Sequence, residues 1–269
     1  MWFFFACRER PLPTRTAQTL VCSIEPLSAL VEELTQPWAT CASFVPKGSS
    51  PETFEPLPNH LQALQSAHAY ITLGLPFELH WLSRLEQLNP HLRMLDLSAS
   101  FTQLSEDPHL WLSPQSLMYM TQQLSGYLQA AFPERRALIT QNTRVTMGKL
   151  TLLDGQLRET IERLSKSGSR ALHFASYHPA WQRVTQDYGL TEHSLFNEGK
   201  EPSPLHLKQF QKLIAEHQIK KLFVPLEFKN PSVEALAQQF KLQPVYIDIL
   251  SRDLTPTISA FIEAMAQGL

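Results

Sequence analysis

Residues 134–167 read ERRALITQNTRVTMGKLTLLDGQLRETIERLSKS, and this stretch decides the architecture of the chain. Apolar residues recur in it at the spacing of one helix face, at Leu138, Ile139, Val145, Leu150, Leu153, Leu157, Ile161 and Leu164. An unbroken helix here would be ~50 Å long, at about 1.5 Å per residue, and could run along two lobes. The only breakers in it are Gly148 and Gly155, so two helices broken near Gly155 are the alternative.

On both sides of this helix, short β-like runs alternate with helical runs. In the first half we expect strands at Ala17–Ile24, Ala39–Val45, Ala67–Gly74 and Arg93–Ser98, and helices at Pro26–Thr35, Leu57–Ser66, Pro76–Leu88 and Pro114–Phe132. In the second half we expect strands at Ser169–Ser176, Lys220–Leu226 and Gln243–Leu250, and helices at Pro179–Tyr188, Ser203–His217, Pro231–Phe240 and Pro256–Ala266. Strands and helices that alternate in steps of this size are typical of parallel βαβ units.

The predicted fold is therefore α/β, with two lobes that each hold a parallel sheet flanked by helices and are joined by one long backbone helix. We divide the 269 residues into an N-terminal tail (1–16), an N-terminal lobe (17–133), the linking helix (134–168) and a C-terminal lobe (169–269). The tail begins MWFFFAC, which we interpret as the remnant of an export signal, loosely similar at Cys7 to a lipoprotein cleavage site. A frayed apolar tail or a wrongly placed start is the alternative.

Composition excludes several classes of function. The formal net charge is −2 and no long Lys/Arg run is present, so we expect no nucleic-acid partner. The chain has only 9 glycines and lacks both GxGxxG and GxxxxGK(S/T), which argues against a nucleotide-binding fold. No segment approaches the ~20 apolar residues that span a bilayer. The motifs HExxH and GxSxG of two hydrolase classes are also absent.

The three cysteines are Cys7, Cys22 and Cys41, and no CxxC occurs among them. A cysteine-based zinc site is therefore not expected. Cys22 and Cys41 fall in the first two expected strands, which could be neighbours. We interpret them as two buried free thiols, and a disulfide formed in an oxidising compartment is the alternative.

Four residues that can bind a metal follow the expected strands. They are Glu52 after the second strand, His109 after the fourth, His178 after Ser169–Ser176, and Asp248 near the end of Gln243–Leu250. Ligands of open α/β sheets bind at the carboxyl ends of the strands, so these side chains could meet between the lobes. Each taken singly has an ordinary explanation, such as a surface carboxylate, a loop histidine or a turn cap. Their shared position predicts a site in the interlobe cleft.

Several stretches, in order, resemble the zinc/manganese ABC-transporter solute-binding proteins. Residues 107–114 read DPHLWLSP and resemble the DPHxWLSP signature of that family, and HPAW at 178–181 with YGL at 188–190 resembles its HDAF…YGL. GKEPSP at 199–204 is similar to its GxEPSP, LFVPLEF at 222–228 to its IFxExQF, and residues 67–74 with Glu78 to its ADLVxxNGxxxE. The resemblance covers nearly the whole chain from Ala17.

This resemblance implies a metal held between two lobes by His109, His178 and the carboxylate of Asp248. It also implies that Glu201 lies nearby. Asp107, two residues before His109, could orient an imidazole. Glu52 stands where the family has a histidine in PHxYEP, because the segment here reads PETFEP. Glutamate can also bind zinc or manganese, so the expected ligand set is Glu52, His109, His178 and Asp248. A weakened site, or one in which Glu55 replaces Glu52, is the alternative.

The function that follows from the resemblance is capture of a divalent metal outside the cytoplasmic membrane and its delivery to an ABC importer. Zn²⁺ is the expected ion and Mn²⁺ or Fe²⁺ the alternatives, since Mn²⁺ lies at the weak end of the affinity order although carboxylates suit it. The expected partners are this ion and a membrane permease, and the expected form is a periplasmic or lipid-anchored extracytoplasmic monomer that is not an enzyme. A two-lobed chelatase and an adhesin-like protein with a degenerate site are the rival interpretations.

Overall fold

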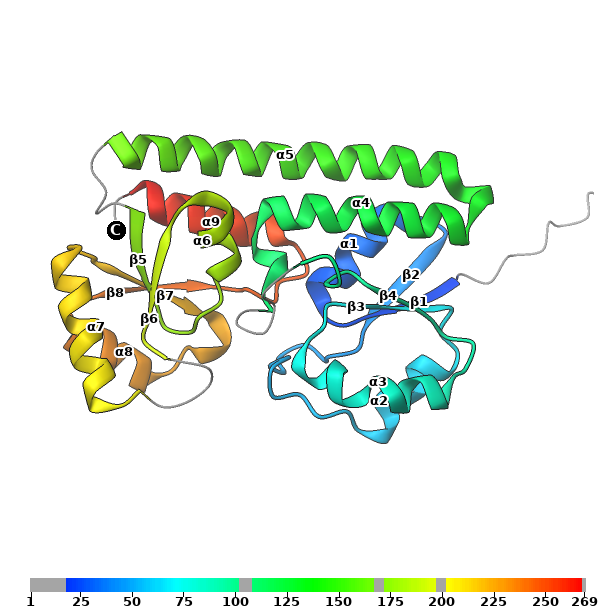
Figure 1. Ribbon diagram of the computed structural model, residues 1–269, viewed down its shortest axis with the longest axis horizontal. Helices are drawn as coiled ribbons and strands as arrows, with labels where there is room; N and C mark the ends of the chain where they lie inside the picture. Colours follow the sequence, from blue (N-terminus) through cyan, green and yellow to red (C-terminus); the bar gives the residue numbers. More distant parts are fainter. Residues whose placement is uncertain (1–17, 102–107, 167–171, 197–201, 268–269) are drawn as a thin grey trace, which may run out of the picture.

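The computed structural model describes residues 18–101, 108–166, 172–196 and 202–267. Two lobes lie side by side beneath one long helix, α5 (Arg136–Lys166), as Figure 1 shows. The sheet of the N-terminal lobe contains the parallel strands β1 (Gln18–Cys22), β2 (Ala39–Ser43), β3 (Ala69–Thr72) and β4 (Arg93–Asp96), in the order β2-β1-β3-β4. The helices of this lobe are α1 (Glu25–Thr35), α2 (Pro58–Gln65), α3 (Pro76–Leu88) and α4 (Pro114–Ala131).

The C-terminal lobe repeats the same strand order with different strands. Its parallel sheet has the order β6-β5-β7-β8, built from β5 (His173–Ser176), β6 (Thr191–Ser194), β7 (Lys221–Pro225) and β8 (Gln243–Ile247). Its helices are α6 (Gln182–Tyr188), α7 (Pro204–Glu216), α8 (Pro231–Gln239) and α9 (Leu254–Ala266). The predicted strands and helices are present, with ends moved by a few residues. The edge strand β6 is an addition that the sequence analysis missed.

Helix α5 is continuous over its 31 residues, so the alternative of a break near Gly155 is wrong. Its buried side chains lie at helical spacing, at Ile139, Thr146, Leu150, Leu153, Leu157, Thr160 and Leu164. A Cβ added at Gly148 or Gly155 would meet no atom within 4 Å, so neither glycine is required by close packing. One face of α5 packs its apolar side chains against α1, α4 and α9, and this packing stabilises the helix despite both glycines.

The main buried core is shared between the two lobes. Residues of both sheets, such as Leu20 and Phe174, belong to one apolar cluster, to which α4, α5 and α9 contribute Leu124, Leu157 and Phe261. A second, smaller cluster lies around β7, α7 and α8 in the C-terminal lobe. Figure 1 shows α5 running over both lobes, which is how a single helix can cover apolar surface of each.

Cys22 and Cys41 form a disulfide, so the interpretation of these residues as buried free thiols is wrong. The reason is the pairing of the strands that carry them, because β1 and β2 are parallel neighbours in which Leu20 lies opposite Cys41. Cys22 therefore lies only two residues along β1 from the residue that pairs with Cys41, on the same face of the sheet.

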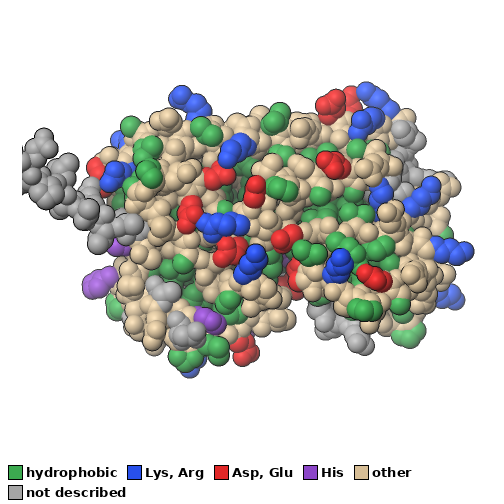
Figure 2. Space-filling model, turned by 180° about the vertical axis from the view of Figure 1, so that it is seen from behind, with side chains coloured by type: hydrophobic (Ala, Val, Ile, Leu, Met, Phe, Trp, Pro, Cys, Tyr) green, Lys and Arg blue, Asp and Glu red, His purple; other side chains and the backbone are tan. Residues whose placement is uncertain are grey.

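The surface is mixed in charge. Figure 2, a view from behind, shows Lys and Arg side chains interspersed with Asp and Glu side chains, in agreement with a formal net charge near zero. Within the parts of the chain that the structure describes, no helix combines the length and the apolar character that crossing a bilayer demands.

Candidate metal centre

Three of the four predicted ligands meet between the lobes. Oε1 of Glu52 lies 2.9 Å from Nε2 of His178 and 3.7 Å from Nε2 of His109. One candidate ligand atom from each of the three side chains lies within 4.8 Å of the other two. Glu52 and His109 come from the N-terminal lobe and His178 from the C-terminal lobe, so an ion bound here would hold the lobes together.

Local structure fixes both imidazoles. His109 is the N-cap of the 3₁₀ turn Leu110–Leu112, whose side chains are all buried, and the Nε1 atom of Trp111 donates a hydrogen bond of 2.7 Å to the carbonyl of Ile249. His178 follows β5, where the backbone N–H of Tyr177 donates to the carbonyl of Phe223 at 2.8 Å. The exposed fractions of His109 and His178 are only 2% and 6%. Such burial limits the rotamers available to each ring and excludes competing water.

Glu52 is the most accessible of the three residues. It lies in the turn Pro51–Thr53 after β2, where its backbone N–H donates to Oγ of Ser50 at 3.3 Å. Its side chain is 28% exposed. A carboxylate that keeps contact with solvent while it touches two buried imidazoles is suited to meet an incoming cation first.

The cavity at this cluster is small. It measures about 10 Å³ and is lined by Ser50, Pro51, Glu52, His109, His178, Glu227, Phe228, Ile249 and Leu250. That volume corresponds to roughly one water-sized particle. This cavity therefore has the dimensions of a single ion.

Glu227 is a candidate that the sequence analysis did not single out. It lies in the turn Leu226–Phe228 directly after β7 and lines the cavity. Burial raises the pKa of its carboxyl, the nearby His178 and His109 lower that pKa electrostatically, and the carboxylate of Asp248 raises it. Glu227 is exposed to solvent, yet it lines the same cavity as His109 and His178 and therefore lies in the electrostatic environment of the cluster. Its position after a buried strand, inside the LFVPLEF stretch, was the available signal.

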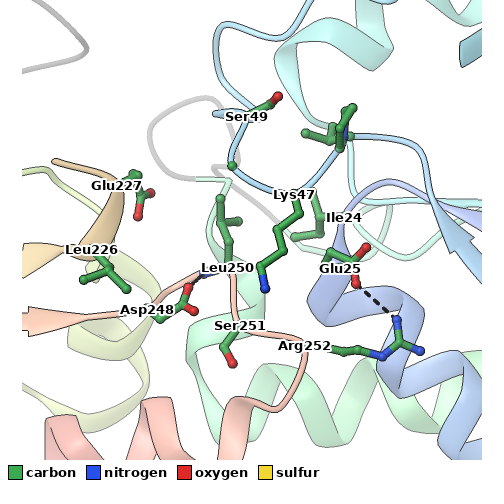
Figure 3. Close-up of a pocket in the computed structure, with 13 residues that line it drawn as sticks. Ile24, Glu25, Lys47, Ser49, Leu226, Glu227, Asp248, Leu250, Ser251 and Arg252 are labelled. Atoms are coloured by element: carbon green, nitrogen blue, oxygen red, sulfur yellow. Dashed lines mark hydrogen bonds and ion pairs between the residues drawn. The ribbon is translucent and has the colours of Figure 1, made fainter. Parts of the chain in front are cut away.

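Asp248 lies beside the cluster and is not one of the three grouped ligands. Its exposed side chain lines a neighbouring pocket of about 380 Å³, and its Oδ1 accepts a hydrogen bond of 3.2 Å from the N–H of Leu250. Figure 3 shows Asp248 and Glu227 on one side of this pocket and Lys47 reaching into it from the other. The structure thus gives two carboxylates, Asp248 and Glu227, from which a fourth ligand could come.

The other acidic residues considered from the sequence have different outcomes. Glu55 is exposed and does not belong to the cluster, so the geometry favours Glu52 over Glu55. Asp107 and Glu201 lie outside the described residues.

Two α/β lobes under one long helix, with imidazoles and a carboxylate converging between them, define a two-lobed binding protein with an ion-sized site. The chain belongs to the family described as zinc-uptake complex component A, periplasmic, which matches residues 20–269. The resemblance noted in the sequence is confirmed by this match.

Relatives and solved structures agree with this family. A putative metal-binding protein of Chlamydia muridarum is 24% identical over 262 residues, which cover 93% of this chain and 91% of the relative. The zinc uptake protein ZnuA of Haemophilus influenzae is 26% identical over 156 residues, 56% of this chain and 44% of that protein. A crystal structure of ZnuA superposes with a TM-score of 0.85 at 27% identity, covering 94% of this chain and 99% of the other. The predicted fold class is confirmed.

Proposed function

We propose that this protein captures a divalent transition metal, with zinc as the first candidate, outside the cytoplasmic membrane and delivers it to an ABC importer. The observation that carries the proposal is the convergence of Glu52, His109 and His178, from both lobes, on an ion-sized cavity. The family description names zinc uptake and the periplasm. A zinc-bound ZnuA deletion mutant with a TM-score of 0.83 at 28% identity, over 93% of this chain and 97% of that chain, adds support.

The donor set determines which ions are suitable. Two imidazoles and one carboxylate are borderline ligands that favour Zn²⁺ over Mg²⁺ or Ca²⁺, and further carboxylate ligation would make Mn²⁺ or Fe²⁺ more competitive. Glu52 together with Asp248 or Glu227 would supply two negative charges, so the occupied site would be neutral overall. We infer that Asp248, the residue expected from the sequence, or Glu227, which lines the cavity, completes the coordination when the ion is bound.

Capture, rather than catalysis, suits the enclosure of the cluster. A catalytic zinc keeps an open coordination position for water or substrate, whereas the cavity at the cluster, at about 10 Å³, has the size of an ion alone. We therefore propose a binding protein that is not an enzyme and that works as a monomer docked on one permease, in the periplasm or attached to a membrane by a lipid.

The first test is the metal content of the purified protein combined with competition between Zn²⁺ and Mn²⁺ in titration calorimetry. Loss of a ligand should cost at least about tenfold in affinity, so Glu52→Ala and His109→Ala should both bind zinc at least that much more weakly. Glu55→Ala is the matched control, since it removes an exposed carboxylate three positions away and should leave affinity unchanged.

The same titration separates the two candidates for the fourth ligand. Glu227→Gln and Asp248→Asn each remove one charge with little change in size, and only the variant at the true ligand should lose affinity by more than about tenfold. A protein that contains no metal, and whose zinc affinity does not respond to Glu52→Ala or His109→Ala, would refute the proposed function.

A further inference from the structure

A second group of potential ligands lies in the C-terminal lobe, away from the interlobe cavity. His173 begins β5, His193 lies on the neighbouring strand β6, and His217 is the C-cap of α7. Their candidate ligand nitrogens all lie within 4.8 Å of one another. Among the described residues, only this group and the Glu52 cluster bring three potential metal ligands this close together.

The nitrogen spacing in this group is close to what a tetrahedral ion requires, whereas the rings of His173 and His217 lie nearly parallel, at 9° between their planes. Nδ1 of His173 and Nε2 of His193 are 3.0 Å apart, and the rings of His173 and His217 stack at 3.7 Å between centroids. Two imidazole nitrogens bound tetrahedrally to zinc at about 2.05 Å lie roughly 3.3 Å apart. Because an imidazole binds a metal in the plane of its ring, an ion could replace the hydrogen bond between His173 and His193 if His217 turns out of its stack on His173.

The surroundings of these histidines favour the neutral form of their imidazole rings. Burial, followed by the charges of His173 and His217, lowers the pKa of His193 to about 4. Burial and the charge of His217 also lower the pKa of His173. Both shifts favour the neutral ring, which is the form that binds metals. The carboxylate of Glu216 opposes both shifts, so it lies near enough to offset part of the charge of an ion.

His217 provides a second, independent observation. Its Nδ1 atom is buried and has no hydrogen-bond partner. Buried polar atoms in native proteins are almost always paired, and an unpaired one costs free energy unless a ligand satisfies it. The unpaired nitrogen belongs to the same cluster in which two other imidazoles already face each other.

We propose that His173, His193 and His217 form a second metal site, which binds a borderline divalent cation such as Zn²⁺ through three imidazoles. Three nitrogen ligands favour zinc, copper or nickel and do not favour Mn²⁺ or Mg²⁺. The fourth position would be filled by water. This site is distinct from the Glu52 cluster, because His173 begins β5, whereas His178 follows the other end of that strand, which ends at Ser176.

The test counts bound zinc in the full chain by native mass spectrometry and by titration with Zn²⁺ alone. His193→Gln and His217→Gln keep a polar side chain of similar size, and melting curves in chelator establish that each variant is folded. We expect each to lose one equivalent that His178→Ala retains, and His178→Ala to lose the equivalent bound between the lobes. The combined variant, His178→Ala with His193→Gln, should bind neither. His91→Ala is the matched control, because it removes an exposed imidazole from the other lobe.

The design separates this inference from the proposed function. If the interlobe site binds nothing, His178→Ala changes nothing, yet His193→Gln still removes an equivalent. The second site is refuted if His193→Gln and His217→Gln leave the number of bound ions and the affinities unchanged. It is equally refuted if His91→Ala lowers binding as much as they do, which would show adventitious binding by surface imidazoles.

Discussion

Glu78 offers the sharpest test of how the N-terminal lobe is held together. It is completely buried in the first turn of α3 and carries four hydrogen bonds. Oε1 accepts from the hydroxyls of Ser23 and Tyr70, each at 2.6 Å, and Oε2 accepts from the backbone N–H groups of Leu73 and Leu75 at 3.1 and 2.9 Å. One carboxylate thus ties the ends of β1 and β3 to the start of α3.

We predict very different costs for two substitutions at this position. Glu78→Ala leaves two rigid backbone N–H donors buried without acceptors, at about 1–3 kcal/mol each, and opens a cavity, so the loss should be about 4 kcal/mol. Glu78→Gln can place its amide oxygen on those two donors and point its NH₂ at the two hydroxyls, whose hydrogens can rotate. Ser23 can then donate to the carbonyl of Ile71, which already lies 3.3 Å away, so the loss should be about 1 kcal/mol.

The pH dependence of stability gives an independent check. Burial raises the pKa of the Glu78 carboxyl above its ordinary value of 4.5. The folded protein therefore keeps this proton at pH values where the unfolded chain has released it. The stability that this group contributes is complete below pH 4.5 and is lost as the pH rises through the folded pKa. Because Gln does not titrate, the stability of the wild type relative to Glu78→Gln should fall as the pH is raised above 4.5.

The assay is chemical unfolding of the wild type and both variants at several pH values, followed by circular dichroism. Equal losses of stability in Glu78→Ala and Glu78→Gln would refute the hydrogen-bond argument, since only the first leaves the backbone donors unsatisfied. A wild-type advantage over Glu78→Gln that grows with pH would refute the direction assigned to the pKa.

Two further predictions concern the covalent and helical frame. Cys22→Ser removes a cross-link between residues 19 positions apart and should lower the free energy of unfolding in urea by about 3 kcal/mol. Reductant should destabilise the wild type by a similar amount and leave the variant unaffected. A wild type whose stability does not respond to reductant would contradict this prediction. Gly155→Ala should raise stability by about 1 kcal/mol, because the residue lies inside a continuous helix with open space around it. Gly148→Ala is the internal comparison, and a loss of stability in Gly155→Ala alone would indicate a real break there.

Much of the fold could be predicted because apolar periodicity is a local signal. The stripe from Ile139 to Leu164 specifies α5, and the continuous apolar runs specify β1, β3 and β7. The edge strand β6 was missed because Thr191–Ser194 reads TEHS, which has no apolar residue. Its backbone pairs with β5 all the same, and no pattern of side chains reports that pairing.

The site was harder to predict, because it depends on where side chains point. The sequence analysis placed Glu52, His109 and His178 in the segments that follow strands, and the structure brings these three side chains together. Asp248 is also near a strand end, but it lies between buried Ile247 and Ile249, so the alternation of the chain turns its side chain toward the neighbouring pocket. The second group was not visible in the sequence, because its members are far apart: His173, His193 and His217. The parallel pairing of β5 with β6 brings the first two together, and the end of α7 adds the third.

The core that extends across both lobes has a consequence for how the protein unfolds. Leu20 and Tyr70 of the first sheet, and Phe174 and Phe261 of the second half, are buried in one connected cluster lined by α5. Neither half can lose its packing without exposing apolar surface of the other, so the lobes form one cooperative unit rather than two independent ones. An ion that binds between the lobes then stabilises the entire chain, and a defect at Glu78 in one lobe lowers the population of the folded state that presents His178 in the other.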